Sequence, residues 1–354
     1  MSIIQSINYN IHIGDESFGE MELFFNRNKY SKIIFLVDEN TKKYCLPIIY
    51  KSVPALNKTS VISIKSGEKH KNIITCAAIW KALSDNKADR KSLLINLGGG
   101  VISDIGGFAA SVFKRGIDFI NIPTTLLAMV DASVGGKTGI NFNGIKNEIG
   151  FFSFPKIVFI HPIFLKTLNK RHLVSGFAEV IKHGLIADKN YWNKVKETNA
   201  LHTEWQEIIT RSVEIKNKIV LSDPYESGLR KILNFGHTIG HALETYSLLH
   251  SKNPLLHGEA LAIGIICETY LSKKMLGLTD EELQDIVLSI ISIFRPNKIM
   301  FPSGHLIRFM VHDKKNQEEK INFTLLNHIG DAKINCTCNK KLIAEAIAFF
   351  NDAV

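Results

Sequence analysis

The stretch SLLINLGGGVISDIGGFAASVFKRG, residues 92–116, contains the pattern that decides the fold. It opens with an apolar run of the length of one buried strand, passes through Gly98 to Gly100, and continues as a helix-like segment. The same alternation precedes it, because apolar runs at 32–40 and 60–65 are each followed by a helical pattern. Strand and helix in repeated alternation predict a parallel sheet that helices cover on both faces.

The glycines at 98–100 indicate a phosphate site. Consecutive glycines between a strand and a helix let backbone amides approach a phosphate, and the helix N-terminus adds a favourable potential, so a dinucleotide pyrophosphate fits there. The spacing is not G-x-G-x-x-G, and a tight structural turn is the competing interpretation. Ribose hydroxyls can be bound by polar residues near the ends of the earlier strands, each of which can equally be a solvated turn residue: Asp38, Asn40, Glu68 and Lys71.

The segment 120–150 is rich in polar residues set among glycines, which let a chain wrap closely around a ligand. The polar residues are Thr124, Thr125, Asp131, Lys137, Lys146 and Asn147. A long solvated loop is the alternative. The interleaved Leu126, Leu127, Met129 and Val134 favour the wall of a buried cleft.

Beyond about residue 162 the periodicity becomes helical. SGFAEVIKHGLIAD begins with a possible N-cap serine and places Glu179 and Lys182 on one helix face. In LRKILNFGHTIGHALETYSLLHSKNPLLHGE, residues 229–259, His237 and His241 stand one helical turn apart and His257 follows in a second polar cluster. Such a set predicts a metal site or a proton relay, and satisfied interface histidines are the alternative. We place a domain boundary near residue 165.

Composition excludes several classes of protein. The 354 residues, 45% of them hydrophobic, suit two domains, and we find no membrane-span-length apolar run and no signal peptide, so we expect a cytoplasmic protein without membrane association. The five cysteines form no disulfide framework. The lysines behind the net charge of +9 are scattered, which argues against nucleic acid and for an anionic small molecule as the partner.

Six motifs in order resemble the 3-dehydroquinate synthases of the sugar phosphate cyclase family over almost the entire chain. They are GGGVISDIGGFAASVFKRG, IPTTLLAMVDASVGGKTGIN, SGFAEVIKHGLI, LRKILNFGHTIGHALE, LHGEA and DKKN. The resemblance implies a dehydroquinate synthase-like fold: a Rossmann-like α/β NAD-binding domain at 1–165, then an all-α metal- and substrate-binding domain at 166–354.

The resemblance also implies an activity and two cofactors. Members of the family convert 3-deoxy-D-arabino-heptulosonate 7-phosphate, a sugar acid phosphate, to 3-dehydroquinate and phosphate in the shikimate pathway. They use NAD transiently and bind one divalent ion, zinc or cobalt. The ion's ligands fall on Glu179, His237 and His257, a set that leaves coordination positions open, as a catalytic site requires.

Further roles are implied at matched positions. His241 either transfers a proton or binds the phosphate, which can itself act as the base. Arg115 matches an arginine that reaches the neighbouring subunit's site, which implies a homodimer. Substrate contacts fall on Lys137, Asn147, Lys182, Lys216, Arg230, Asn234 and Lys314. NAD contacts fall on Asp38, Asn40, Glu68, Lys71, Gly99, Gly100, Asp104, Thr124, Thr125, Asp131, Lys137, Lys146, Phe164, Thr167 and Leu168.

Three alternative functions remain open. A related cyclase acting on sedoheptulose 7-phosphate or glucose 6-phosphate should have altered carboxylate-binding cations. A non-catalytic NAD-binding homologue should lack a metal ligand or a phosphate lysine. A metal-dependent alcohol dehydrogenase would release NADH and need no phosphate clamp. The cations and ligands named above are all present in the sequence, which favours the synthase.

Overall fold

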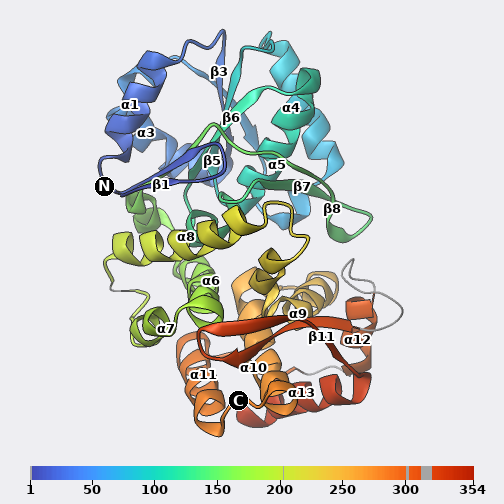
Figure 1. The fold of residues 1–354 in the computed structure, drawn as a ribbon. Coiled ribbons are helices and arrows are strands. Elements are labelled where there is room, and N and C mark those ends of the chain that lie inside the picture. The colour runs from blue at the N-terminus through green and yellow to red at the C-terminus, as the bar shows by residue number, and fades with distance from the viewer. Residues whose placement is uncertain (1, 202, 300–302, 312–320) are drawn as a thin grey trace. The chain divides into compact units, whose positions relative to one another are not determined.

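The computed structural model of the protein describes residues 2–201, 203–299, 303–311 and 321–354 (Figure 1). Its internal contacts divide the chain into two compact units. The first consists of the residues up to Asn169 together with Glu204–Pro224, and the second of Lys170–Thr203 together with Tyr225–Val354. The helix at 205–222 therefore groups with the N-terminal residues, although it lies in the 166–354 half of the sequence.

The first unit is built on a seven-stranded sheet in the order β1-β2-β9-β6-β5-β3-β4. Neighbouring strands are parallel except β1 and β2, which are antiparallel. The strands are Ser2–Gln5 (β1), Asn10–Ile13 (β2), Ile33–Asp38 (β3), Ser60–Ile64 (β4), Leu93–Gly98 (β5), Asp118–Pro123 (β6) and Ile157–Ile160 (β9). The parallel sheet with its crossover helices confirms the predicted α/β fold class of this part.

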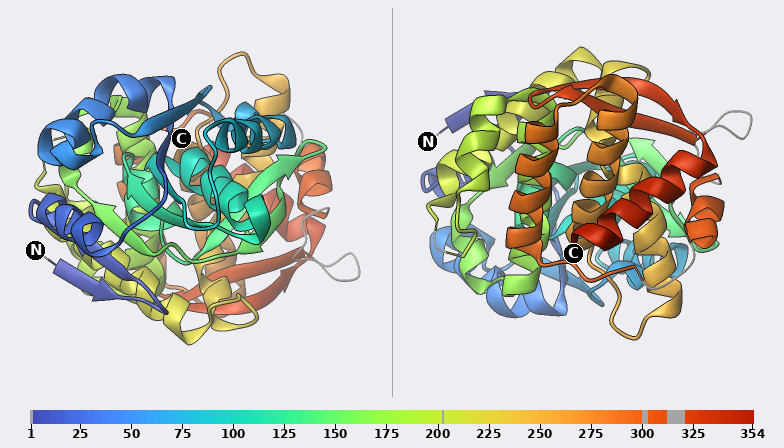
Figure 2. Two further views of the ribbon diagram at one scale, coloured as in Figure 1. Left: turned by 90° about the horizontal axis from the view of Figure 1, so that it is seen from above. Right: turned by 90° about the horizontal axis from the view of Figure 1, so that it is seen from below.

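The helices of the first unit cover both faces of the sheet. They are Ser17–Arg27 (α1), Glu39–Tyr44 (α2), Leu46–Ser52 (α3), Ile73–Asp85 (α4) and Gly100–Val112 (α5), while Trp205–Ser222 (α8) of the same unit packs against the segment 128–132. Ile34 and Leu36 of β3 join one core cluster with α4 and α5, the two helices seen together in Figure 2, left. Phe35, which points the other way, meets Tyr50 of α3 edge to face. Side chains on the two faces of β3 thus pack into two different cores, which explains why both faces of this strand are apolar.

The segment 120–150 forms regular structure after β6. A π-helical turn spans Ala128–Ala132, and an antiparallel hairpin follows, made of Lys137–Phe142 (β7) and Ile145–Phe152 (β8). Gly139 and Gly150 face each other in this hairpin, and a Cβ on Gly150 would lie 2.6 Å from the carbonyl oxygen of Thr138. The glycines therefore permit a close approach of the two strands, while Met129 and Val134 are buried as a wall.

The second unit is mostly helical, as predicted. Its helices are Lys170–Ala187 (α6), Lys189–Lys196 (α7), His237–His250 (α9), His257–Leu276 (α10), Asp280–Phe294 (α11), Ser303–Val311 (α12) and Lys340–Ala353 (α13). Helix α10 packs against α6, α9, α11 and α13 (Figure 2, right). A two-stranded antiparallel sheet, Ile321–His328 (β10) and Asp331–Cys338 (β11), also belongs to this unit and was not predicted. Among the described residues no helix is long and apolar enough to cross a bilayer.

A substitution at Gly106 of α5 can test how closely this helix packs on the sheet. A Cβ at this position would lie 2.0 Å from Asn96 Oδ1, and Asn96 is buried and bonded to Asn121. We expect Gly106→Ala to lower the free energy of unfolding by about 1–3 kcal/mol, because an overpacked core must shift. Chemical denaturation followed by circular dichroism measures the change.

The matched control is Gly19→Ala in α1, where a Cβ would meet nothing within 4 Å. An added methyl group there should raise stability by about 0.5–1 kcal/mol, because glycine is the poorer helix former. Equal stability of the Gly106→Ala and Gly19→Ala proteins would contradict the close packing of α5 on the sheet.

Candidate active site

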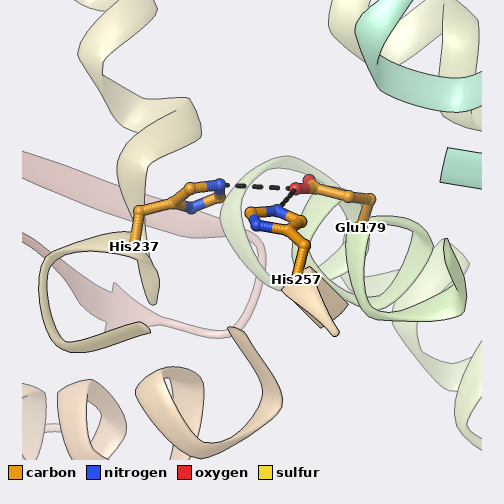
Figure 3. Close-up of side chains that lie close together, drawn as sticks. All are labelled: Glu179, His237 and His257. Carbon is orange, nitrogen blue, oxygen red and sulfur yellow. Dashed lines mark hydrogen bonds and ion pairs between the residues drawn. The ribbon is translucent and has the colours of Figure 1, made fainter. Parts of the chain in front are cut away.

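The second unit brings Glu179, His237 and His257 together (Figure 3). Glu179 lies in α6, while His237 and His257 are the first residues of α9 and α10. Nε2 of His237 is 3.3 Å and Nε2 of His257 is 3.1 Å from the same oxygen, Glu179 Oε1. The residues named from the sequence as metal ligands thus share one small volume, although 78 positions separate Glu179 from His257.

The remaining ring nitrogens of both histidines are bonded to the protein. His237 Nδ1 lies 3.1 Å from the carbonyl oxygen of Phe235, and His257 Nδ1 lies 3.1 Å from Glu244 Oε2. Both partners are acceptors, so each Nδ1 carries a proton and donates it. Each Nε2 is therefore directed at the Glu179 carboxylate, which is the orientation that metal-binding histidines adopt through such outer partners.

The charges of the cluster are set by burial and by mutual contacts. Burial, together with the charge of nearby Lys182, lowers the pKa of His237 to about 4. Burial opposes the charge on His257 as well, but its hydrogen bonds to Glu179 and Glu244 prevail and raise its pKa to about 9. The pKa of Glu179 falls well below its usual value, because Lys182 and the two imidazoles outweigh the cost of its burial. His237 is thus neutral at pH 7, with a lone pair on Nε2.

These observations fit a divalent cation. A neutral His237 directs the Nε2 lone pair at a carboxylate oxygen 3.3 Å away, an arrangement that a positive ion between the two atoms would stabilise. Two ligand atoms at 2.0–2.1 Å from a tetrahedral zinc ion are roughly 3.3 Å apart, close to the two separations measured here. One oxygen and two nitrogens leave at least one coordination position for a substrate atom.

Other predicted residues of this unit lie beside the cluster or in the segment that leads into it. The ring of His241 lies 5.0 Å from that of His237 and 5.8 Å from that of His257. Lys182, buried one helical turn after Glu179, forms an ion pair with Glu179 Oε2. Arg230, also buried, and Asn234 belong to the 3-10 segment Leu229–Asn234, which leads into His237. Lys314 lies outside the described residues.

Glu244 was not predicted from the sequence. It is buried in α9 and accepts the hydrogen bond from His257 described above, and it also belongs to a second potential metal-binding group with His241 and His257. A signal for it existed: positions 237, 241 and 244 have the i, i+4, i+7 spacing of one helix face.

In the first unit, most residues predicted to bind the dinucleotide follow the carboxyl ends of parallel strands. The five strand ends in question are Asp38 (β3), Ile64 (β4), Gly98 (β5), Pro123 (β6) and Ile160 (β9). Asp38 is itself such an end. The predicted residues that follow the five ends, in the same order, are Asn40; Glu68 and Lys71; Gly99 and Gly100; Thr124 and Thr125; and Phe164, Thr167 and Leu168. Parallel strands end at one edge of a sheet, where ligands of such folds bind, so the structure brings these residues to one edge.

Several of these residues have structural partners as well. Asp38 caps α2 by accepting hydrogen bonds from the amides of Asn40 and Thr41. Gly99 is the N-cap of α5, and a Cβ there would lie 2.9 Å from the Thr125 side chain. Thr167 donates to the Phe164 carbonyl at 2.9 Å. These contacts fix the strand-end loops without requiring a ligand.

Lys71 is the centre of a polar cluster at this edge. Its Nζ lies 2.8 Å from Asp104 Oδ2, 2.7 Å from Asn147 Oδ1 and 3.3 Å from Glu68 Oε1, and Lys146 lies 3.7 Å from the same Glu68 oxygen. Burial works against the charge of Lys71, but Asp104 and Glu68 outweigh it and raise the pKa of the lysine. The cluster ties the β7–β8 hairpin, through Asn147, to the loop after β4.

Lys216 of α8 binds Asp131. Its Nζ lies 2.6 Å from both the Asp131 side-chain oxygen Oδ1 and the Asp131 carbonyl oxygen. A lysine predicted to contact substrate and an aspartate predicted to contact NAD are therefore partners in the first unit. Lys137 is exposed at the start of β7.

Arg115 stands apart from the strand-end residues. It is exposed in the turn after the C-terminal end of α5, whereas Gly100 begins that helix, so about 20 Å separates them at 1.5 Å per residue. The structure does not bring Arg115 into the dinucleotide group, and its predicted role in a neighbouring subunit stays a prediction.

Comparison with known protein families matches residues 61–175 to the 3-dehydroquinate synthase N-terminal domain and residues 176–316 to the 3-dehydroquinate synthase C-terminal domain. A 3-dehydroquinate synthase of Parabacteroides distasonis is 45% identical over 339 residues, which cover 94% of this chain and 95% of the relative.

Two solved structures show the same fold. A 2-deoxy-scyllo-inosose synthase complexed with carbaglucose-6-phosphate, NAD+ and Co2+ has a TM-score of 0.86 at 23% identity, covering 98% of this chain and 99% of the other. The 2-epi-5-epi-valiolone synthase of Streptomyces hygroscopicus subsp. jinggangensis, with NAD+ and Zn2+ bound, has a TM-score of 0.82 at 24% identity, covering 99% of each chain.

Glu244 offers a test of the cluster's capacity to hold a metal. We expect Glu244→Gln to weaken zinc or cobalt binding about 10- to 100-fold, because His257 loses the carboxylate that orients its ring and raises its basicity. Isothermal titration calorimetry on metal-free protein measures the affinity.

The control is Glu282→Gln in α11, whose carboxylate accepts a hydrogen bond from the Ile329 amide and is not among the groups of potential ligands. This variant should keep the wild-type affinity. Equal affinities for the Glu244→Gln protein and the wild type would show that Glu244 does not support a metal ligand.

Proposed function

The chain belongs to the 3-dehydroquinate synthase family, and we propose on that basis that it converts 3-deoxy-D-arabino-heptulosonate 7-phosphate to 3-dehydroquinate and phosphate. The enzyme would be a carbon–oxygen lyase of the shikimate pathway, serving aromatic amino acid biosynthesis. The observation that carries the proposal is the 45% identity over 94% of the chain. The buried group of Glu179, His237 and His257 adds independent support, because it has the donor set of a catalytic metal site.

The proposed cofactors are NAD and one divalent ion, zinc or cobalt. Glu179, His237 and His257 would hold the ion, and the residues after the ends of β3, β4, β5, β6 and β9 would hold NAD. When bound, the ion supplies Lewis acidity at a substrate alcohol and NAD supplies its transient oxidation, which makes the neighbouring carbon–hydrogen bond acidic enough for phosphate elimination. Because the hydride is returned, NAD is not consumed.

The chain's own side chains would bind and orient the substrate. Lys182, Arg230 and Asn234 in the second unit, and Lys137, Asn147 and Lys216 in the first, supply donors for its phosphate and carboxylate groups. Such charge-assisted hydrogen bonds contribute about 1.5–3 kcal/mol each. Lys182 is buried and paired with Glu179, so its ammonium group is already held in place. His241, partly exposed beside both ligand histidines, would move a proton or bind the phosphate.

Two further properties belong to the proposal. The protein would act as a homodimer, with Arg115 reaching the neighbouring subunit, and the exposure of Arg115 supports this role. It would act in the cytoplasm, and its five free cysteine thiols suit a reducing compartment.

The decisive experiment supplies metal-loaded protein with the heptulosonate phosphate and a catalytic amount of NAD. We expect stoichiometric phosphate release without net NADH, because each turnover returns the hydride. Phosphate is measured with a colorimetric assay and NADH by absorbance. Accumulating NADH would identify a dehydrogenase, and no phosphate release despite bound NAD would indicate a non-catalytic homologue. Turnover of sedoheptulose 7-phosphate or glucose 6-phosphate in preference to the sugar acid would point to another cyclase.

His257→Ala tests the ligand assignment. We expect turnover to fall to background and metal content to drop, because one of three protein ligands is lost, while NAD affinity stays close to wild type. Metal content is measured by atomic emission spectroscopy and NAD affinity by fluorescence. His250→Ala, which alters an exposed histidine at the end of α9, is the control and should keep both metal and turnover. Full metal occupancy in the His257→Ala protein would remove His257 from the ligand set.

A further inference from the structure

Helix α10 carries two carboxylates that are not among the proposed metal ligands, Glu259 and Glu268. Glu259 is bonded to α6, which carries Glu179, and Glu268 is bonded to the start of α9, which carries His237. Glu259 forms a two-pronged ion pair with Arg171 of α6, with Nε to Oε1 and Nη2 to Oε2 both 2.7 Å. Arg171 also donates to Asn253 Oδ1 at 3.0 Å and to the Pro254 carbonyl at 2.8 Å. The arginine thus ties α6 both to the first turn of α10 and to the loop before it.

The pairing of α6 with the start of α10 continues toward the metal ligands. Three residues of α6, each four positions after the last, contact three successive residues of α10. Arg171 contacts Glu259, Ser175 contacts Gly258, and Glu179 contacts His257. The middle pair is a close backbone contact. The Gly258 amide donates to Ser175 Oγ at 3.0 Å, and a Cβ on Gly258 would lie 1.8 Å from the Ser175 carbonyl oxygen. Three successive contacts therefore fix the register in which Glu179 faces His257.

Glu268 acts on the other ligand-bearing helix, α9. Its side chain is fully buried, and its two oxygens accept hydrogen bonds from the Gly236 amide at 2.6 Å and the Ile239 amide at 3.1 Å. These amides flank His237, at the helix terminus where a carboxylate is most favourable. Gly264 of α10 lets the chain come close, because a Cβ there would lie 2.0 Å from the Gly236 carbonyl oxygen. Glu268 thus fixes the start of α9, where His237 stands.

We propose that Glu259, through Arg171, and Glu268 are positioning residues that set the separation of Glu179, His237 and His257 by tying α6 and α9 to α10. The inference rests on the metal site proposed above and adds a pair of carboxylates that touch neither metal nor substrate. A metal site needs its ligands held within about 0.5 Å, and these two sets of contacts hold the ligand-bearing helices rather than the imidazole rings. Loss of either anchor changes where a ligand helix begins.

The test is a Co2+ titration of the metal-free, full-length protein, followed by visible absorption, which reports both affinity and ligand geometry. We expect Arg171→Met and Glu268→Gln each to weaken Co2+ binding on the order of tenfold or more and to shift the absorption bands. Arg171 is partly exposed, so its replacement leaves the core intact even if Glu268→Gln lowers the yield of folded protein.

The matched control is Asp188→Asn, which removes a carboxylate cap from α7, a helix of the same unit that carries no proposed ligand. Asp188→Asn should lower thermal stability and leave the Co2+ affinity and spectrum unchanged. If the wild type binds no Co2+, the proposed metal site falls and this inference with it. If the wild type binds Co2+ and Arg171→Met and Glu268→Gln match Asp188→Asn in affinity and spectrum, only the positioning role is overturned.

Discussion

The burial of one carboxylate governs the architecture of the second unit. Glu179 is 1% exposed, and an isolated buried charge costs more free energy than a single hydrogen bond returns. Lys182 of the same helix and two imidazoles from α9 and α10 surround it, so the imidazoles can offset part of the cost only if α9 and α10 are brought to α6. The hydrogen bonds of His257 to Glu179 and Glu244 raise the pKa of this ring, so the carboxylates stabilise positive charge there, although burial and Lys182 lower the pKa of His237. The fold thus creates a place where a cation is stabilised.

Glu179, His237 and His257 come from three different helices, so these helices must pack closely for the three side chains to meet. Two glycines of α10 permit this close packing, because they have no side chain at the points of contact. Gly258 lies against α6, and Gly264 lies against Gly236, the residue before α9. Close contact alone would allow the helices to slide. Ser175 and Glu268 prevent sliding by accepting directional hydrogen bonds from the Gly258 and Gly236 amides, since each bond is satisfied in one register. Packing therefore supplies proximity, and polar contacts supply position.

The sequence predicts the helices and strands themselves better than the contacts between them. The apolar run of β5 with its glycines, the residues at strand ends and the spacing of His237 and His241 all follow from local periodicity. Periodicity says which face of a helix is buried but not what covers it, so the helix that contains Lys216 could not be assigned to the first unit. Glu268 has the pattern of an ordinary helix residue, and Glu244 shares only a helix face with His237 and His241, because the roles of both depend on contacts that local spacing does not contain. The β10–β11 hairpin was missed because helical segments were extended across it.

The buried lysines connect the electrostatics to the proposed chemistry. Lys71, Lys182 and Lys216 are each at most 5% exposed, and each is paired with a carboxylate: Asp104, Glu179 and Asp131, respectively. Pairing offsets the cost of burying an ammonium group and restricts it to one place. Of these lysines, Lys182 and Lys216 are the ones proposed to contact substrate, and each would be a cation that needs little reorganisation, which is the condition under which electrostatic stabilisation is most effective. A site for an uncharged alcohol has no need of such preplaced cations, so Lys182 and Lys216 suit the anionic substrate of the proposed function.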